Sequence, residues 1–268
     1  PYYRKLAQQT GFKVESFKNL EDLEKIPPLE SKLVRNDPSK FLAENMIERI
    51  VTMRRSSGTT STPVRVYISR DEIDAAAYYS RIMKSYIQDE INNRNISLFV
   101  GNMNLILMRV LSEFTIVSEM DYLPGREFDK VIEDLLYEYK LPNFPNRISS
   151  VTVGTARVIR LLTKALIKKG IDPNSLGITK FVVLDSLSES TKKWIKETWN
   201  ADVNCIFSLA ECAGGAYQCE YGNYHYDICS YPEIIDVEKL NPVKEGEEGR
   251  EKKEEDKMDD LFIENSDQ

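Results

Sequence analysis

Histidine is nearly absent from this chain of 268 residues, in which His225 is the only one. A cysteine nucleophile needs a histidine base or a basic neighbourhood to form its thiolate, so such catalysis has little support here. Long apolar runs are missing too: none approaches the length that spans a membrane, and no charged-then-apolar leader precedes the first expected helix. The sequence therefore predicts a cytoplasmic protein without a membrane partner.

An excess of basic residues is also missing, because the formal net charge is −7. Residues 244–268 carry 11 acidic and 5 basic side chains, so this tail holds nearly all of the negative charge. Without a basic surplus, binding to nucleic acid or to an anionic membrane has little electrostatic support. The tail is too charged to bury, and we expect it to be disordered or a marginal surface helix. The expected organisation is one domain over residues 1–243, followed by this tail.

Cysteine is scarce, and all four cysteines share one short stretch with the histidine. Disulfides are not expected in a chain without secretory features. Cys212, Cys219, His225 and Cys229 supply three thiolates and one imidazole, a common zinc ligand set, although no C-x-x-C knuckle is present. The alternative is that the cysteines are small buried hydrophobic residues and that the histidine lies on the surface. This explains the same residues equally well, so both interpretations stay open. Cys205 lies within an expected strand and is interpreted as a core residue.

The segment Ser56–Thr62 packs six hydroxyl side chains and one glycine between two runs that alternate as strands do. Gly58 allows the backbone to approach a ligand closely or to adopt a positive φ. The hydroxyls and successive N–H groups form a set of donors suited to phosphate oxygens. A Ser/Thr-rich hairpin turn accounts for the same composition. The sequence thus indicates a loop between two strands, either a phosphate clamp or a plain turn.

The middle of the chain alternates strands and helices, with strands expected over 148–154, 181–184 and 203–207 and helices over 155–169 and 189–199. This order is typical of an α/β fold with a parallel sheet and right-handed crossovers. Ligands of such sheets lie at the carboxyl ends of the strands. We therefore expect the segments after these strands to face one cleft: Thr155, Asp185-Ser186 and Ser208-Leu209-Ala210-Glu211. Other expected elements are helices over 19–26, 69–86 and 126–139 and strands over 48–54, 98–100, 105–108 and 233–237.

The hydroxyl loop resembles the phosphate loop S-S-G-T-T-G-K-P of the adenylate-forming (acyl-CoA synthetase) superfamily, here Ser56 to Pro63. The branch it resembles most is that of phenylacetate–CoA ligases and deazaflavin-adenylating synthetases. Further similarity lies at Val151–Thr155, at Phe207–Glu211 against the family's Y-G-x-T-E, and at Ala213–His225. The resemblance covers roughly residues 1–249 in the right order. It implies an acyl-CoA synthetase-like N-terminal domain with parallel sheets flanked by helices, truncated before the C-terminal subdomains.

The resemblance also implies a reaction and its residues. In this family a carboxylate attacks the α-phosphate of ATP to give an acyl-adenylate, which a thiol such as coenzyme A then captures. Adenine nucleotide, Mg²⁺ and a carboxylic acid are the implied ligands, and zinc is implied by a cysteine and a histidine that the branch has in this region. The implied catalytic residue is Glu211, which would contact Mg²⁺. The implied nucleotide-binding residues are Ser56, Ser57, Gly58, Thr59, Thr60, Phe207 and Ser208.

Several departures from the family pattern predict weak or lost activity. The loop's Gly-Lys is Ser61-Thr62, Phe207 and Ser208 replace Tyr-Gly, and Ala210 replaces the threonine. The family's ribose-binding aspartate and catalytic lysine belong to segments beyond the position of Gly249, where the charged tail begins. An electrostatic clamp on the transferring phosphoryl group can lower the barrier by several kcal/mol. Three functions therefore stay open: a truncated acid–CoA ligase, a non-catalytic interaction or regulatory protein, and half of a ligase completed by a separate C-terminal chain. A homo-oligomer and a complex with a partner chain also stay open.

Overall fold

The computed structural model forms two compact units, one of Pro1–Tyr67 with Tyr231–Gln268 and one of Ile68–Ser230. The residues that the structure describes are 2–11, 13, 16–19, 22, 26, 29, 31–55, 63–87, 95–101, 115–120, 125–208, 215–219 and 221–226.

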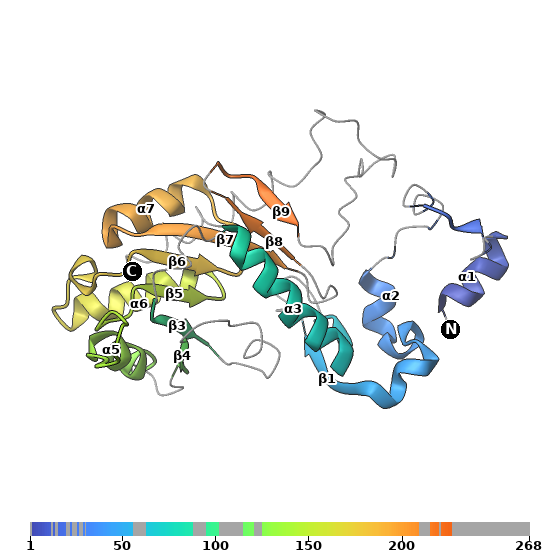
Figure 1. Cartoon of the computed structure of the whole chain (residues 1–268), viewed down its shortest axis with the longest axis horizontal. Coiled ribbons are helices and arrows are strands. Elements are labelled where there is room, and N and C mark those ends of the chain that lie inside the picture. Colours follow the sequence, from blue (N-terminus) through green and yellow to red (C-terminus); the bar gives the residue numbers. More distant parts are fainter. Residues whose placement is uncertain are drawn as a thin grey trace. The chain divides into compact units, whose positions relative to one another are not determined.

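The second unit is built on a seven-stranded sheet with the order β4-β3-β5-β6-β7-β8-β9 (Figure 1). The first five strands in this order are parallel, and β8 and β9 continue the sheet as an antiparallel hairpin on β7. This sheet confirms the predicted mainly parallel α/β fold. The strands are β3 (Ser97–Val100), β4 (Thr115–Ser118), β5 (Ser150–Val153), β6 (Lys180–Val183), β7 (Asp202–Ser208), β8 (Gly215–Gln218) and β9 (Tyr224–Tyr226).

The five parallel strands have the order of a doubly wound sheet. The chain passes from β3 to β4 in one direction and then returns past β3 to β5, β6 and β7. The direction of winding therefore reverses between β3 and β5, which is where ligands of such sheets enter. Their register is uniform, since Val100, Val153, Val183 and Cys205 lie side by side across the sheet.

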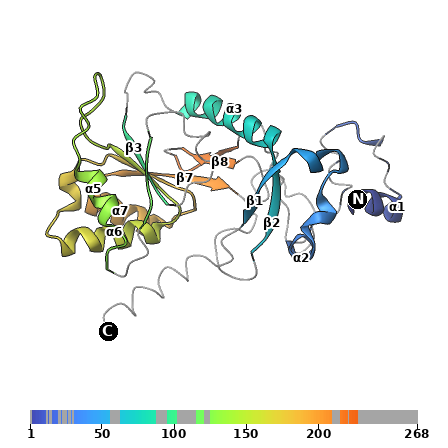
Figure 2. The same cartoon turned by 90° about the horizontal axis from the view of Figure 1, so that it is seen from below.

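One face of this sheet carries the hydrophobic core of the second unit. Leu98, Val151 and Phe181 are fully buried and pack against three helices, α5 (Asp129–Leu136), α6 (Ala156–Lys168) and α7 (Glu189–Trp199), seen together in Figure 2. In β5 and β6 the side chains on alternate positions point to the other face, where they are only partly buried. Ser97 and Ser150 share a hydroxyl–hydroxyl hydrogen bond of 2.6 Å on that face.

A polar contact fixes how α6 and α7 pack over the core. The indole Nε1 of Trp199 donates to Thr163 Oγ1 (3.0 Å), and this hydroxyl donates to the Ile159 carbonyl (2.8 Å). The Trp199 ring is 1% exposed and lies edge-on to Phe181, with ring centroids 5.0 Å apart. Because every buried polar atom of this contact is paired, the tryptophan adds apolar burial without a desolvation cost.

Local signals explain where several elements of the second unit begin and end. Ser188 caps α7 by accepting from the Thr191 N–H (3.3 Å), and Asn200 ends the helix in the left-handed region with φ of 53°. The helix α3 (Arg70–Ile87) begins in the same way, since the Glu72 N–H donates to Ser69 Oγ (3.2 Å). Side-chain caps of this kind stabilise a helix start by about 1 kcal/mol. The 3₁₀ turn η5 (Pro173–Leu176) follows α6.

The first unit has little regular structure in its described part. It contains α1 (Tyr2–Thr10), α2 (Ser31–Asn36), the 3₁₀ helices η3 (Pro38–Phe41) and η4 (Glu44–Arg49), and a two-stranded sheet of β1 (Ile50–Arg55) and β2 (Arg65–Ser69). The last two residues of β2 belong to the second unit. Among the described residues of the first unit, Val64 is the only buried hydrophobic side chain.

Most predicted elements within the described residues are confirmed, with shifted ends. The helix expected over 126–139 is shorter, because Tyr137 is already extended, and the strand expected over 48–54 starts after η4. The hairpin β8–β9 was not predicted. The strands expected over 105–108 and 233–237 and the tail 244–268 lie outside the described residues. No helix within the described ranges is long and apolar enough to cross a membrane.

Candidate functional site

The ends of β5, β6 and β7 lie at one edge of the sheet, as the sequence predicts. Val153, Val183 and Cys205 are in register. Thr155 and Asp185 follow the last residues of β5 and β6 by two positions, and Phe207 lies within β7 two positions beyond Cys205. The parallel direction of the three strands brings these segments together although they are far apart in the sequence. We call this set the carboxyl edge.

The start of α6 supplies hydrogen-bond donors to the carboxyl edge. Thr155 occupies the cap position with extended backbone (φ −146°, ψ 159°), but its side chain makes no capping hydrogen bond. Ser188, by contrast, caps α7. An uncapped helix start offers free N–H groups and a partial positive charge, which together favour an anion. The start of α6 can therefore accept a negatively charged group more readily than the start of α7.

An aromatic cluster follows at the end of β7. Phe207 lies opposite Ala216, and Ala216 lies opposite Tyr226, so these side chains share one face of the antiparallel sheet. The ring of Phe207 is 6.4 Å from those of Tyr224 and Tyr226, at steep angles of 72° and 70°. Phe207 was a predicted nucleotide contact, whereas the two tyrosines were not. The signal for them is the alternation Tyr224, His225, Tyr226, which places both rings on the face of Phe207.

Cys205 lies in the core, as predicted. It is fully buried, and burial raises the pKa of its thiol, against smaller opposing effects of the Lys192 ammonium and of a hydrogen bond with the Leu187 backbone. A raised pKa keeps the thiol protonated near neutral pH, and a protonated thiol is a poor nucleophile. The environment of Cys205 therefore fits a core residue.

Two of the four predicted zinc ligands come together on the β8–β9 hairpin. His225 lies opposite Tyr217, and Cys219 follows Tyr217 by two residues, so both side chains belong to one face. The turn is closed by the Cys219 N–H donating to the Asn223 carbonyl (2.9 Å) and by Gly222 at φ of 81°. Within the described ranges, no group of three or more His, Cys, Asp or Glu side chains could hold a metal ion. Cys212 and Cys229 lie outside those ranges.

The remaining predicted site residues are not described either. These are Glu211 and the loop residues Ser56, Ser57, Gly58, Thr59 and Thr60. The loop's flanking strands are present, since β1 ends at Arg55, β2 begins at Arg65, and the two pair in one sheet. The two strands predicted on either side of this segment are therefore observed. Ser208 is the last residue of β7, opposite Gly215.

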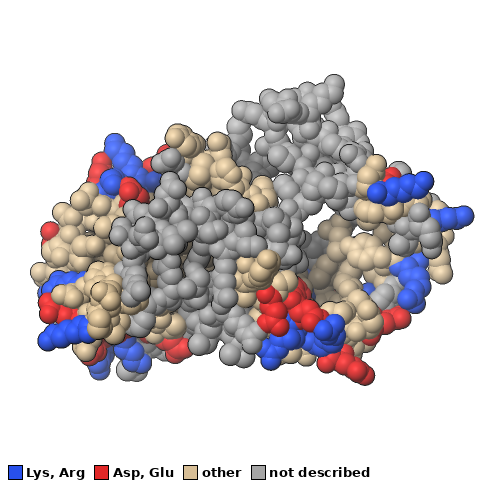
Figure 3. Space-filling model, viewed as in Figure 1, with Lys and Arg blue, Asp and Glu red and all other residues tan. Residues whose placement is uncertain are grey.

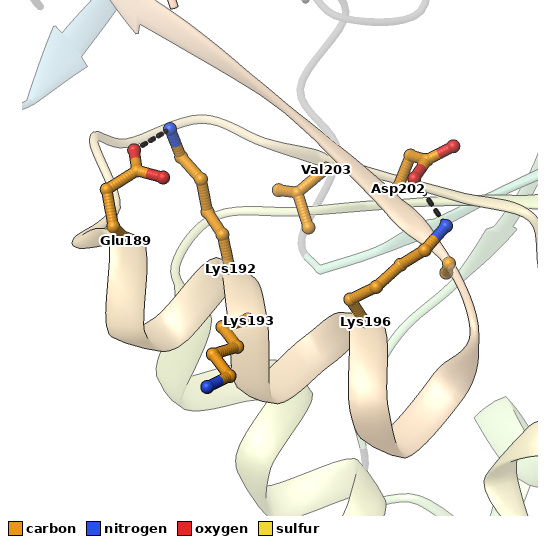
Figure 4. Close-up of a pocket in the computed structure, with 7 residues that line it drawn as sticks. Glu189, Lys192, Lys193, Lys196, Asp202 and Val203 are labelled. Atoms are coloured by element: carbon orange, nitrogen blue, oxygen red, sulfur yellow. Dashed lines mark hydrogen bonds and ion pairs between the residues drawn. The ribbon is translucent and has the colours of Figure 1, made fainter.

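A groove of about 330 Å³ lies at the opposite end of β7 (Figure 4). It is lined by Val203 and by two ion pairs, Lys192 with Glu189 (2.8 Å) and Lys196 with Asp202 (2.7 Å). Asp202 is the first residue of β7, so the groove is at the amino ends of the strands and is not the predicted cleft. On the face shown in Figure 3, basic and acidic side chains of the described residues are interspersed.

Comparisons with known proteins connect this arrangement to a group of ligases. The chain is 23% identical over 263 residues to the phenylacetate-coenzyme A ligase of Thermus thermophilus, covering 93% of this chain and 56% of that one. A solved structure of 2-hydroxyisobutyryl-CoA ligase, in an open conformation with 2-HIB-AMP and CoA, aligns over 93% of this chain and 55% of that one, with a TM-score of 0.70 and 18% identity. A structure of the same ligase in the thioesterification state aligns over 93% of this chain and 54% of that one, with a TM-score of 0.71 and 20% identity.

The chain has the fold of an acyl-CoA ligase. The predicted resemblance to the adenylate-forming superfamily is confirmed, and it concerns the N-terminal region of those proteins. No family model matches the sequence. The chain spans about 55% of the length of the relatives it matches.

Proposed function

We propose that this chain is the nucleotide-binding N-terminal part of an acid–CoA ligase of the adenylate-forming type. The reaction of such a ligase is the ATP-dependent activation of a carboxylate to an acyl-adenylate and then to an acyl-CoA. The observation that supports the proposal is the carboxyl edge, where the start of α6, which has no side-chain cap, and the aromatic cluster of β7 follow parallel strands of an acyl-CoA ligase fold. In this proposal residues 1–243 are the incomplete ligase domain and residues 244–268 are a charged tail.

Each side chain of the proposed site has a chemical role. Phe207 offers a ring on which adenine can stack, and base stacking on an aromatic side chain contributes about 1–3 kcal/mol. Ser208 is beside it at the end of β7. The hydroxyls and N–H groups of Ser56, Ser57, Gly58, Thr59 and Thr60 would hold the β- and γ-phosphates. The start of α6, where the side chain of Thr155 makes no capping bond, is suited to an anionic group of the ligand.

Glu211 is the residue proposed to hold Mg²⁺. A carboxylate oxygen is a ligand that Mg²⁺ prefers, and the metal when bound neutralises charge on the phosphates. Glu211 follows Phe207 by four residues, in the position that the family's Y-G-x-T-E gives to its glutamate. This puts the carboxylate in the segment that leaves the carboxyl edge after β7.

The proposed activity of the chain alone is weak or lost. Ser61-Thr62 replaces the Gly-Lys of the phosphate loop, so the cation that would meet the β- and γ-phosphates is missing from the loop. Phe207 lacks the hydroxyl of the family's tyrosine, and Ala210 lacks the donor of its threonine. Donors directed at developing charge are worth about 3–4 kcal/mol each in catalysis. These changes should weaken adenylation of the carboxylate more than they weaken binding of adenine nucleotide. The reason is that stacking of adenine on the Phe207 ring does not require the lost cation, hydroxyl or threonine donor.

Zinc is part of the proposal as a structural ion. The β8–β9 hairpin carries Cys219 and His225 on one face, and thiolate with imidazole is a donor set that suits zinc. Cys212 and Cys229 would complete four ligands. Elemental analysis of the purified protein tests this directly: about one zinc per chain supports the site, and less than about half a zinc per chain rejects a closed structural site.

A carboxylate-dependent exchange of pyrophosphate into ATP tests the catalytic part of the proposal. A panel of aromatic and aliphatic acids is supplied with ATP and Mg²⁺, and exchange above the acid-free control shows adenylation. No exchange with any acid, from protein with a cooperative unfolding transition, rejects adenylation by this chain alone. That result would favour a non-catalytic function of the chain, for which we expect nucleotide binding without turnover.

The second candidate function is half of a split ligase, completed by a C-terminal part. The matched region is 54–56% of the length of these relatives, so their remaining part is the component to supply in the test. Pyrophosphate exchange that appears only after a C-terminal part is added distinguishes this candidate from a non-catalytic protein.

A further inference from the structure

The solvent-exposed side of α6 carries cations and aliphatic side chains and no acidic residue. Arg157, Leu161, Lys164 and Lys168 recur at intervals of four, three and four residues, so they form one stripe along the helix. All four are exposed, and Ile167 beside them is 61% exposed. The opposite side of α6 is packed into the core. We call Arg157, Leu161, Lys164, Ile167 and Lys168 the α6 face.

The three cations of the α6 face keep their charge free for an outside partner. Within the part of the chain that the structure describes, none of them forms an ion pair. The lysines of α7 differ, since Lys192, Lys193 and Lys196 each pair with a carboxylate at 2.7–3.9 Å. Both helices belong to the layer that covers one face of the sheet (Figure 2). The α6 face therefore gives this layer an unbalanced positive charge.

Arg160 and Trp194 border the α6 face on the side of α7. The guanidinium of Arg160 lies 4.7 Å from the centre of the Trp194 ring and donates to Thr191 Oγ1 (3.2 Å). Trp194 is only partly buried, so part of its ring stays at the surface. Tryptophan beside cations is typical of the boundary between lipid headgroups and the apolar layer below them. The border thus adds a fourth cation and an amphipathic ring.

The combination of free cations with exposed aliphatic side chains decides the kind of partner. A phosphate backbone attracts the cations but offers no apolar surface to Leu161 and Ile167. A small ligand needs a concave site, and the groove found among the described residues is lined by no residue of the α6 face. A lipid surface supplies both anionic headgroups and an apolar layer below them.

We propose that the α6 face binds the surface of an anionic lipid bilayer, with its cations among the headgroups and Leu161 and Ile167 at the edge of the apolar layer. The proposal goes beyond the ligase function and does not rest on it. It differs from the expectation drawn from the whole sequence, whose net charge of −7 gives no attraction to an anionic surface. Residues 244–268 hold nearly all of that charge, and charges act over about 8 Å at physiological salt. The α6 face therefore acts at contact, whatever the net charge of the chain.

Vesicle sedimentation with the full chain tests the proposal. Vesicles of phosphatidylcholine with about one third phosphatidylserine are expected to carry the chain into the pellet, whereas vesicles of phosphatidylcholine alone are not. Raising the salt from about 0.05 M to about 0.3 M should weaken the binding several-fold, because salt screens the cations. Each cation near an anionic surface contributes about five-fold to the affinity.

Two double charge reversals locate the surface. Lys164→Glu with Lys168→Glu is expected to weaken the binding about 25-fold or more, because two cations are lost. Lys32→Glu with Lys40→Glu makes the same change in net charge on α2 and η3, and it should change the affinity by less than about two-fold. All four lysines are exposed, and circular dichroism checks that both variants keep the wild-type spectrum.

A third variant tests the aliphatic side chains. Leu161→Ser with Ile167→Ser keeps every charge and should weaken the binding about five-fold or more, because apolar burial is lost. Binding to a polyanion through charge alone would not respond to this change.

Three results overturn the proposal. They are no binding to phosphatidylserine vesicles up to about 1 mM accessible lipid, equal binding by the two charge-reversal variants, and a serine variant that binds as tightly as the wild type. The last result would assign the α6 face to polyanions or to an acidic protein.

Discussion

The two units differ in how far their own residues cover their apolar side chains. The second unit buries one face of a seven-stranded sheet under three helices and fills that layer with fully buried side chains such as Phe181, Leu162 and Trp199. The described part of the first unit buries Val64 and exposes Tyr3, Leu33, Ile47, Val51 and Met53. Within the described residues, the second unit covers one sheet face with its own helices, whereas the first unit leaves several large apolar side chains exposed.

Hydrogen exchange gives the largest expected contrast between the units. Amides of β5, β6 and β7 open only when the second unit unfolds, whereas those of η4 and β1 need only local opening. Since a few kcal/mol separates the two kinds of opening, we expect protection factors to differ about a thousand-fold or more. Exchange read by mass spectrometry checks this. Equal protection of residues 50–55 and 150–153 would remove the contrast.

Replacing the central tryptophan tests the strength of the second unit's core. Trp199→Ala removes a side chain that is 1% exposed, and it leaves Thr163 without its donor. We expect the free energy of unfolding to fall by about 3–5 kcal/mol. Trp194→Ala is the control: Trp194 is partly buried under Arg160, and its loss should cost clearly less. Urea denaturation measures both, and equal losses would contradict the core as described.

The two helix starts provide a smaller and matched test. Ser188→Ala removes a capping bond to the Thr191 N–H and should lower the free energy of unfolding by about 1 kcal/mol. Thr155→Ala removes no capping bond and should change it by less than about 0.5 kcal/mol. A large loss from Thr155→Ala in thermal or urea unfolding would show that α6 is capped after all. The start of α6 would then be no free anion site.

A surface carboxylate gives the smallest expected effect. Hydrogen bonds from Arg126 and Lys169 hold the pKa of Asp129 below its usual value. Its contribution to stability is therefore full above the unfolded-state pKa of about 3.9 and is lost as pH falls through the lower folded-state value. The melting temperature of Asp129→Asn should lie slightly below that of the wild type at pH 6. The gap should narrow as the pH falls through the folded-state pKa, and a gap that widens in acid would have the wrong sign.

The part of the fold that sequence predicts well is the part where each element is specified locally. The helix expected over 189–199 matches α7, because Ser188 and Asn200 mark its two ends. The helix expected over 155–169 differs from α6 by one residue at each end. The hairpin β8–β9 was missed because its short strands contain glycine, glutamine and histidine. Their pairing with β7 depends on tertiary contact and not on propensity.

The candidate site was predictable to a similar degree. Parallel strands bring the ends of β5, β6 and β7 to one edge, and the sequence order alone implies this. The presence of Cys219 and His225 in one hairpin could not be read from spacing, because it depends on where the turn falls. The groove at the start of β7 was not predicted either, since it arises from long lysine side chains on α7 and carries no motif.

Binding of AMP tests the central claim most directly. Isothermal titration calorimetry of the wild-type chain with AMP is expected to show one site with a dissociation constant of about 1 mM or lower. A dissociation constant of about 1 mM corresponds to a binding free energy of about −4 kcal/mol. Phe207→Ala should weaken it about ten-fold through lost stacking, and Lys193→Ala, in the groove at the other end of β7, should leave it unchanged. No binding at millimolar AMP, or equal binding by the Phe207→Ala variant, would contradict a nucleotide site at the carboxyl edge.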